Sequence, residues 1–191
     1  TDFYGANAKI LIKPQKNAIT DALTASLASA GPSKDEIANE IEVLTSSSLI
    51  NEVINKLNLD ISYFIEGRLK TGEIYQGRPF YVEGKILDWN YYGVPIYVSI
   101  ISKEKYRLSI DHEGKKYNGI HKFGEPVVND KLSMIINSDS TILNDKSVAS
   151  IGEAKYLFRF NERTALVKKF QNALTLSMDE EATVINAFIE D

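Results

Sequence analysis

The chain has 191 residues, enough for one domain or two small ones, and its 43% hydrophobic and 25% charged residues are typical of a globular protein. Its 22 basic and 26 acidic residues give a net charge of −4, and no cluster of Lys and Arg forms a basic face, so no nucleic-acid partner is predicted. The absence of cysteine excludes thiolate metal sites, redox motifs and disulfides, and no apolar run approaches the roughly 20 residues that span a bilayer.

The N-terminal third of the chain predicts a strand followed by helices. Residues 3–14 alternate apolar and polar side chains and so predict a strand. Residues 15–32 carry a weak helical spacing among Thr and Ser, and predict either a helix or a loose linker. The sequence "SKDE" at 33–36 is a capping box, which predicts a helix that begins near Asp35.

The apolar stripe of this helical region changes face in the middle. Ile37, Ile41 and Leu44 share one side of a helix, whereas the apolar residues of 49–57 point largely to the opposite side. Between them lie Ser46 to Ser48, and serine is poor in a helix interior but good at an N-cap. This pattern predicts two short helices, about 35–45 and 48–58, with a single kinked helix as the alternative.

From residue 61 the pattern becomes that of strands separated by Gly, Pro and Asn turns, and across roughly 74–140 it predicts an antiparallel sandwich or barrel. The predicted strands are 61–69, 79–87, 95–102, 105–111, 131–137 and 155–160.

The C-terminal part predicts a helix over 161–173, capped by Asn161, and then a hairpin of 174–178 with 182–190. The predicted fold class is therefore α+β: a mixed or antiparallel sheet with packed helices built from both chain ends, plus an inserted antiparallel β module. We expect a base domain from 1–73 and 141–191, with 74–140 as the inserted module. In this arrangement the first and last strands share a sheet, on which the helix 161–173 packs.

The only two histidines do not form a recognisable catalytic or metal site. Asp111, His112 and Glu113 suggest acid–base chemistry, but strand alternation puts both carboxylates on one side and the imidazole on the other. We interpret this segment as a solvated hairpin tip. His121 has no nearby carboxylate other than Glu125, which disfavours zinc ligation. We predict no catalytic residues, no cofactor-binding residues and no metal ligands.

A cluster of aromatic residues at 89–97 is the strongest candidate for a contact surface. Trp89, Tyr91, Tyr92 and Tyr97 surround a predicted turn, and exposed flat rings can stack on a sugar. The alternative is that these rings cover the end of the β module's core. Trp89, Tyr91 and Tyr92 are the candidate residues for contact with a glycan or a partner.

Four segments carry a resemblance to a known family. The run from Ile41 to Ser46, followed by Leu49, Val53, Ile54, Leu57 and Leu59, resembles the signature segment of chain-length determinant proteins, the Wzz-like polysaccharide copolymerases and Wzc-like exopolysaccharide transport proteins. The alternation at 4–12 is similar to that family's first periplasmic strand, and 174–191 resembles its closing hairpin. Residues 63–82 look like those of longer, often kinase-linked members. Thr45 departs from the family pattern, in which many members have a basic residue.

This resemblance implies a non-catalytic periplasmic domain of an inner-membrane protein that forms a homo-oligomer and controls the length or export of an exopolysaccharide. The implied partners are polysaccharide polymerase and export proteins, and the polysaccharide itself. In the family the domain is flanked by transmembrane helices, and a cytoplasmic tyrosine kinase can follow. The sequence begins at Thr1 without a signal peptide, and we interpret it as a processed product or an excised fragment. We expect this chain alone to be monomeric or weakly associated.

Two other functions remain open from the sequence. One is a carbohydrate-binding module that uses the aromatics around Trp89. The other is a hydrolase that uses Asp111, His112 and Glu113.

Overall fold

The structure, a computed structural model, describes residues 5–12, 34–67, 71–178 and 184–190. Contacts divide the chain into two compact units: a terminal unit, residues 1–57 with 164–191, and a central unit, residues 58–163. The predicted helix or linker at 15–32, the Ser33 cap and the turn of the C-terminal hairpin lie outside the described residues.

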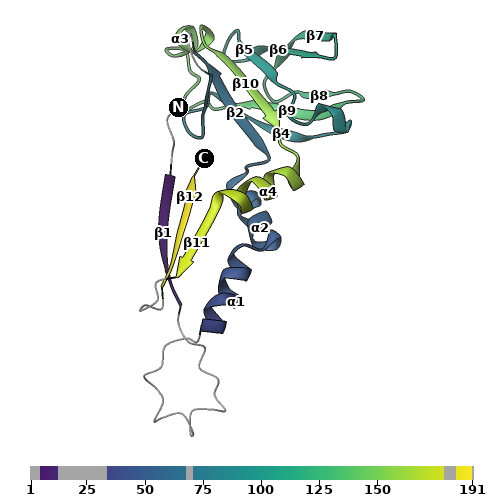
Figure 1. Cartoon of the computed structure of the whole chain (residues 1–191). Coiled ribbons are helices and arrows are strands. Elements are labelled where there is room, and N and C mark those ends of the chain that lie inside the picture. The colour runs from purple at the N-terminus through teal and green to yellow at the C-terminus, as the bar shows by residue number, and fades with distance from the viewer. Residues whose placement is uncertain (1–4, 13–33, 68–70, 179–183, 191) are drawn as a thin grey trace, which may run out of the picture. The chain divides into compact units, whose positions relative to one another are not determined.

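The terminal unit contains three strands and three helices among its described residues. They are β1 (Gly5–Leu11), α1 (Lys34–Leu44), α2 (Ser47–Leu57), α4 (Arg163–Ala173, which begins at the boundary), β11 (Leu174–Met178) and β12 (Val184–Glu190). The strands form one antiparallel sheet in the order β1-β12-β11. Figure 1 shows α1 and α2 running alongside this sheet. The buried side chains of this unit come from both kinds of element: Ile37, Ile50, Ile54, Val167 and Ile185.

The pairing of the first and last strands is confirmed. β1 and β12 run antiparallel with Gly5 opposite Glu190 and Leu11 opposite Val184. Residues opposite each other share a face, so Ile10 lies beside the buried Ile185 on one side of the sheet. The two ends of the described chain therefore lie side by side.

The predicted break between the first two helices is also confirmed, and Ser46 is the cap of the second helix. α1 ends at Leu44 and α2 begins at Ser47. The Leu49 N–H donates to Ser46 Oγ (3.3 Å), the N-cap bond, and the Gln171 side chain of α4 donates to the Thr45 carbonyl (2.9 Å). The serines thus start a second helix that buries a different face.

Replacing Ser46 with alanine should lower the free energy of unfolding by about 0.5–2 kcal/mol, because the Leu49 N–H loses its side-chain acceptor. Urea denaturation followed by far-UV circular dichroism measures this loss. Ser48→Ala is the matched control, because this exposed residue lies inside the first turn and should change stability much less. An equal loss in both variants would contradict the assignment of the cap.

The central unit contains nine strands and two short helical segments among the residues described. The strands are β2 (Ile61–Glu66), β3 (Thr71–Glu73), β4 (Phe80–Ile86), β5 (Ile96–Ile100), β6 (Lys105–His112), β7 (Lys115–Lys122), β8 (Pro126–Val128), β9 (Leu132–Ser138) and β10 (Lys155–Phe160); the helical segments are η1 (Trp89–Tyr91) and α3 (Val148–Gly152).

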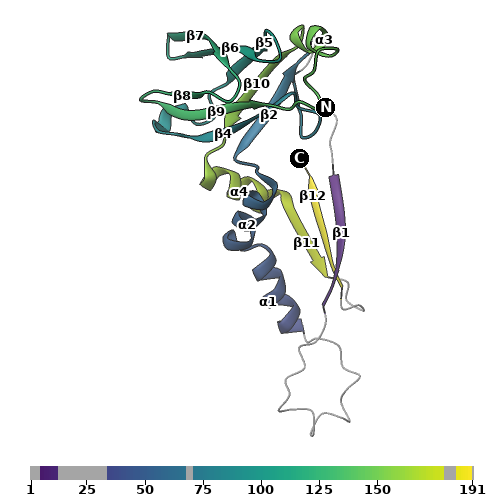
Figure 2. The same cartoon turned by 180° about the vertical axis from the view of Figure 1, so that it is seen from behind.

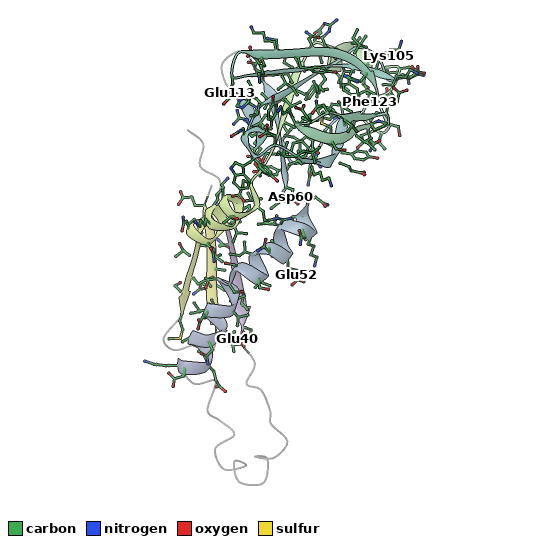
Figure 3. All side chains as sticks on the ribbon, turned by 90° about the vertical axis from the view of Figure 1, so that its right-hand side faces the viewer. Glu40, Glu52, Asp60, Lys105, Glu113 and Phe123 are labelled. Carbon is green, nitrogen blue, oxygen red and sulfur yellow. The ribbon has the colours of Figure 1, made fainter. Side chains whose placement is uncertain are left out.

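These strands form two antiparallel sheets, in the orders β3-β2-β10-β5-β6-β7 and β4-β9-β8. Figure 2 shows the second sheet as a separate layer below β5 to β7. One core cluster draws side chains from both sheets, with Phe80, Tyr106, Leu132 and Phe158 among those with at most 2% of their surface exposed. Figure 3 shows the side chains crowded between the two layers.

The predicted α+β fold class is wrong. The structure is 46% strand and 26% helix, with twelve strands in three antiparallel sheets and four short helices among the described residues. β3, β7 and β8 are not among the predicted strands, because their short or polar sequences (TGE, KKYNGIHK and PVV) show no apolar alternation. These strands are held by hairpin pairing to neighbours that do contribute core residues.

The boundaries between the observed units differ from the predicted domain boundaries. Contacts change units after residues 57 and 163, whereas the sequence placed the junctions after 73 and 140. The difference arises because β2 and β10 pair with each other and β10 pairs with β5, so both join the sheet of the central unit. No helix within the described ranges is both long and apolar enough to cross a membrane.

Candidate functional site

The predicted aromatic residues lie on a short turn that is fixed at its base. Asp88 caps η1 by accepting a hydrogen bond from the Asn90 N–H (3.1 Å), and its carboxylate pairs with Lys131 (3.1 Å). The Leu87 and Asp88 N–H groups both donate to the Lys131 carbonyl. The Asn90 N–H and then Lys131 hold the pKa of Asp88 below its usual value. The aromatic turn, residues 88–92, therefore has a defined conformation.

Trp89 is the exposed member of this turn. Its side chain is 67% exposed, and the edge of the Tyr92 ring packs against it with centroids 5.2 Å apart. Tyr91 and Tyr92 are half-buried against the core cluster of the central unit. Tyr97 lies within β5, opposite Ser109 and Leu157. The structure thus brings Trp89, Tyr91 and Tyr92 together, with one ring free to contact a ligand.

The segment Asp111 to Glu113 does not form a catalytic triplet. β6 ends at His112, and Glu113 and Gly114 adopt the left-handed φ values of a tight hairpin turn, 50° and 75°. The Asp111 carboxylate pairs with Lys116 (3.2 Å), whereas the imidazole of His112 meets the ring of Tyr91 edge-on at 5.0 Å. The carboxylate and the imidazole thus engage different partners.

His121 takes part in an aromatic stack on β7. The Tyr117 hydroxyl is hydrogen-bonded to His121 Nε2 (2.8 Å), and the imidazole stacks on Tyr106 with centroids 5.7 Å apart. Gly119 lies between Tyr117 and His121 along the strand, where a Cβ would come within 2.6 Å of the Tyr117 hydroxyl oxygen. Burial raises the pKa of Tyr106 to about 12. This arrangement is explained by packing.

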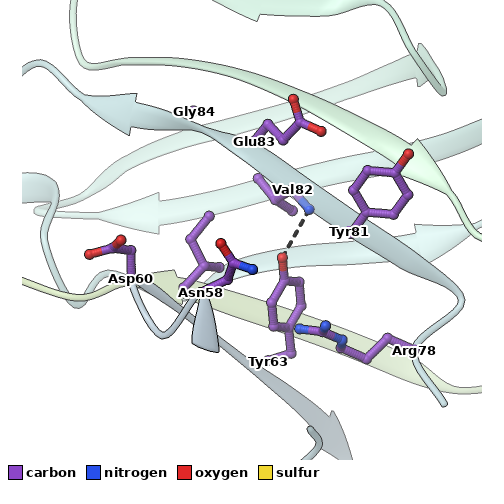
Figure 4. Close-up of a pocket in the computed structure, with 9 residues that line it drawn as sticks. Asn58, Asp60, Tyr63, Arg78, Tyr81, Val82, Glu83 and Gly84 are labelled. Carbon is purple, nitrogen blue, oxygen red and sulfur yellow. Dashed lines mark hydrogen bonds between the residues drawn. The ribbon is translucent and has the colours of Figure 1, made fainter. Parts of the chain in front are cut away.

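The structure contains a cleft that the sequence patterns do not predict. It has a volume of about 570 Å³ and lies between the open edge of β4 and the start of β2, within the central unit (Figure 4). The lining residues are Asn58, Asp60, Ile61, Tyr63, Arg78, Tyr81, Val82, Glu83 and Gly84. This volume is within the range of small-molecule sites.

Tyr63 forms the wall of the cleft and fixes its geometry. Its hydroxyl oxygen accepts a hydrogen bond from the Val82 N–H (2.9 Å), which satisfies a backbone donor on the unpaired edge of β4 (Figure 4). Its ring packs against Phe80 and Phe158 in the core, and burial raises the pKa of its hydroxyl. The guanidinium of Arg78 lies 4.2 Å from the centre of the Tyr63 ring, a cation–π contact that orients it.

The opposite rim of the cleft is held by hydrogen bonds to the end of β10. The Asn161 side chain donates to the Leu59 carbonyl (2.9 Å) and to Ser62 Oγ (3.0 Å). Asp60 pairs with Arg163 (2.9 Å), so its charge is matched by a cation. The rim therefore presents its polar groups from a fixed backbone.

Local sequence signals could not reveal this cleft. Its residues come from two segments, 58–63 and 78–84, which are joined by the hydrogen bond between Tyr63 and Val82 and by packing between the two sheets. Tyr81 and Glu83 follow the outward alternation of β4, which marks them as exposed but gives no indication of a cleft. No group of His, Cys, Asp and Glu within the described ranges could hold a metal ion.

Comparison of the sequence with protein-family models gave no match, and comparison with curated proteins gave none either.

Proposed function

We propose that this chain is the non-catalytic periplasmic domain of an inner-membrane polysaccharide copolymerase, which controls the length or export of a surface polysaccharide as a homo-oligomer. One observation carries the proposal. The segments that resemble chain-length determinants at 4–12, 41–59 and 174–191 include β1, the last turn of α1, α2, β11 and β12 of the terminal unit. Segments distant in the sequence thus share both the resemblance and a folding unit.

The register of the terminal sheet supports membrane anchoring on both sides of the domain. Gly5 at the start of β1 lies opposite Glu190 at the end of β12. Segments that precede and follow these strands in a longer protein would therefore leave the domain at the same place. This geometry is compatible with a domain inserted between two transmembrane helices.

An apolar stripe on α2 supports assembly into an oligomer. Leu49, Val53 and Leu57 lie one helical turn apart on one face, and Val53 and Leu57 are 44% and 60% exposed. The adjoining stripe of the same helix buries Ile50 and Ile54. In a ring each subunit uses two different surfaces, and membrane tethering raises the effective concentration, so one modest stripe is enough for a contact with the next copy.

Deletion of the full-length gene in the source bacterium should change the amount or length distribution of its surface polysaccharide, measured by gel electrophoresis of extracted glycan. Complementation with the wild-type gene should restore it. The paired substitution of Val53 and Leu57 by glutamate should fail to restore it at equal protein level, because buried charge disfavours the contact between copies. Glu52→Gln, on an exposed position of the same helix, is the matched control and should complement. A deletion strain with unchanged polysaccharide would contradict the proposal.

A carbohydrate-binding module is the second candidate function, favoured by the 67% exposure of Trp89 and by its support from Tyr92. The two functions are compatible in one chain, because the aromatic turn belongs to the central unit and the resemblance segments belong largely to the terminal unit. The two functions predict different results. If Trp89→Ala abolishes glycan binding and the gene deletion strain has unchanged polysaccharide, the carbohydrate-binding module is favoured.

A further inference from the structure

We propose that the cleft between β4 and β2 is a binding subsite for uncharged sugar units, with Arg78, Tyr81 and Glu83 as its main contact residues. The proposal rests on the proposed function, since it identifies the ligand as a polysaccharide, and it deepens that function by placing direct glycan contact in the central unit. The residues are separate from the aromatic turn that the sequence predicted.

The first argument is the mixture of hydrogen-bonding groups in the cleft. Arg78 supplies donors, Glu83 and Asp60 supply acceptors, and the Asn58 amide supplies both. Figure 4 shows these side chains around one opening, with Val82 and Tyr63 at its base. A sugar hydroxyl both donates and accepts, so a set of mixed planar polar groups matches a row of such hydroxyls better than it matches a purely acidic or basic ligand.

The second argument is the charge balance. Asp60 is paired with Arg163, which leaves Arg78 and Glu83 as one positive and one negative charge on the cleft walls. These two charges nearly cancel at the distance of a bound ligand. A polyanion would meet the carboxylate of Glu83, and a polycation would meet Arg78, so the cleft favours an uncharged ligand that is rich in hydroxyl groups.

The third argument is that the contact groups are held in place before a ligand arrives. The Arg78 guanidinium carbon lies over the Tyr63 ring, 4.2 Å from its centre, and Tyr63 is itself fixed by Val82 and the core rings. Tyr81 keeps 44% of its surface exposed and offers a ring for stacking. Preorganised groups lose little conformational freedom on binding, which favours a weak, uncharged ligand.

The fourth argument links the cleft to the aromatic turn through β10. The Gly93 N–H, next to the turn, donates to the Phe160 carbonyl (2.8 Å). The Asn161 N–H, one residue further on, donates to the Asp60 carbonyl at the cleft rim (2.8 Å). The cleft and the turn therefore flank the same end of β10. A polymeric ligand could contact both, whereas a single sugar unit could not.

The test is a titration of the ¹⁵N-labelled chain, residues 1–191, with four neutral probes (cellotetraose, maltotetraose, mannotetraose and galactotetraose) and one anionic probe (tetragalacturonate). We expect at least one neutral probe to shift the amide signals of Val82 and Gly84 and the Arg78 Nε–H signal. The expected dissociation constant is about 1 mM or lower.

Single substitutions locate the site. Arg78→Ala, Tyr81→Ala and Glu83→Gln should each weaken binding of the active probe about tenfold, with the amide spectrum outside the cleft unchanged. Lys85→Ala is the matched control, because Lys85 is an exposed residue of β4 on the same side as Tyr81 and Glu83 but outside the cleft lining. It should bind the probe as the wild type does.

Three results would overturn the proposal: no shift at the cleft with any probe, binding of tetragalacturonate alone, or shifts confined to the aromatic turn that Trp89→Ala abolishes. None of these results bears on the proposed function, which the polysaccharide phenotype of the gene deletion tests separately. Conversely, cleft binding in a chain whose deletion leaves the polysaccharide unchanged would overturn the proposed function and keep the sugar subsite.

Discussion

Replacing Phe158 with alanine should lower the free energy of unfolding of the central unit by about 3–5 kcal/mol, the range for truncating a large aromatic side chain in a core. Phe158 is fully buried in β10, between β2 and β5. Its ring has centroid distances of 6.3, 6.4 and 5.8 Å to Tyr63, Phe80 and Phe160. Since these rings come from both sheets, none can fill the cavity without moving its own strand.

Urea denaturation followed by fluorescence measures this loss, because Trp89 is the only tryptophan and lies in the central unit. Tyr81→Ala is the control, since this ring is 44% exposed. Its removal should change the free energy of unfolding by no more than about 0.5 kcal/mol. A loss below about 1 kcal/mol for Phe158→Ala would show that the two sheets do not share a tightly packed core.

The strands that the sequence predicted well are those with an inward apolar series. Residues 79–87 and 131–137 were predicted as strands, and the structure has β4 at Phe80–Ile86 and β9 at Leu132–Ser138. Their alternation arises because one side of each strand faces the core. β7 has the sequence KKYNGIHK, exposed along most of its length, and pairing with β6 rather than burial holds it in place. Pairing of this kind leaves little trace in a hydrophobic pattern.

The helix break shows a similar limit at single-residue resolution. A change of apolar face across Ser46 to Ser48 was enough to predict that the helix stops and restarts there. The choice among three adjacent hydroxyls depends on which one reaches a free N–H, and the structure gives that role to Ser46. The local sequence offers the same side chain at all three positions, so it cannot select the cap.

The two candidate surfaces differ for a related reason. Trp89, Tyr91 and Tyr92 lie within four consecutive positions, so a local reading of the sequence could bring them together. The cleft joins Asp60 with Glu83, and their proximity depends on β2 and β4 belonging to different sheets that meet at Tyr63. Predicting it would have required the sheet order, which the sequence patterns did not give.

Replacing Gly84 with alanine should lower the free energy of unfolding by about 3 kcal/mol, at the upper end of the usual cost of overpacking. A Cβ at this position would overlap the Ser133 carbonyl oxygen and lie 2.6 Å from Met134 Cβ and 2.7 Å from Met134 Cα. These are mostly backbone atoms of β9, which is paired with β4 on one side and β8 on the other. The strand therefore cannot yield without breaking hydrogen bonds, and Met134 itself is buried in the core.

The same substitution connects the stability of the central unit with its cleft. Gly84 lines the cleft, and a shift of β4 would carry Tyr81 and Glu83 away from the rim that Asp60 forms on the other side. We therefore expect Gly84→Ala to reduce both the urea midpoint, measured by Trp89 fluorescence, and the affinity for a neutral tetrasaccharide probe. Gly72→Ala is the matched control, because no atom lies within 4 Å of a Cβ at that strand position. There the alanine should lower the conformational entropy of the unfolded chain without destabilising the folded one. Wild-type stability in Gly84→Ala would mean that β4 and β9 have room between them, and that the geometry of the cleft does not depend on their close approach.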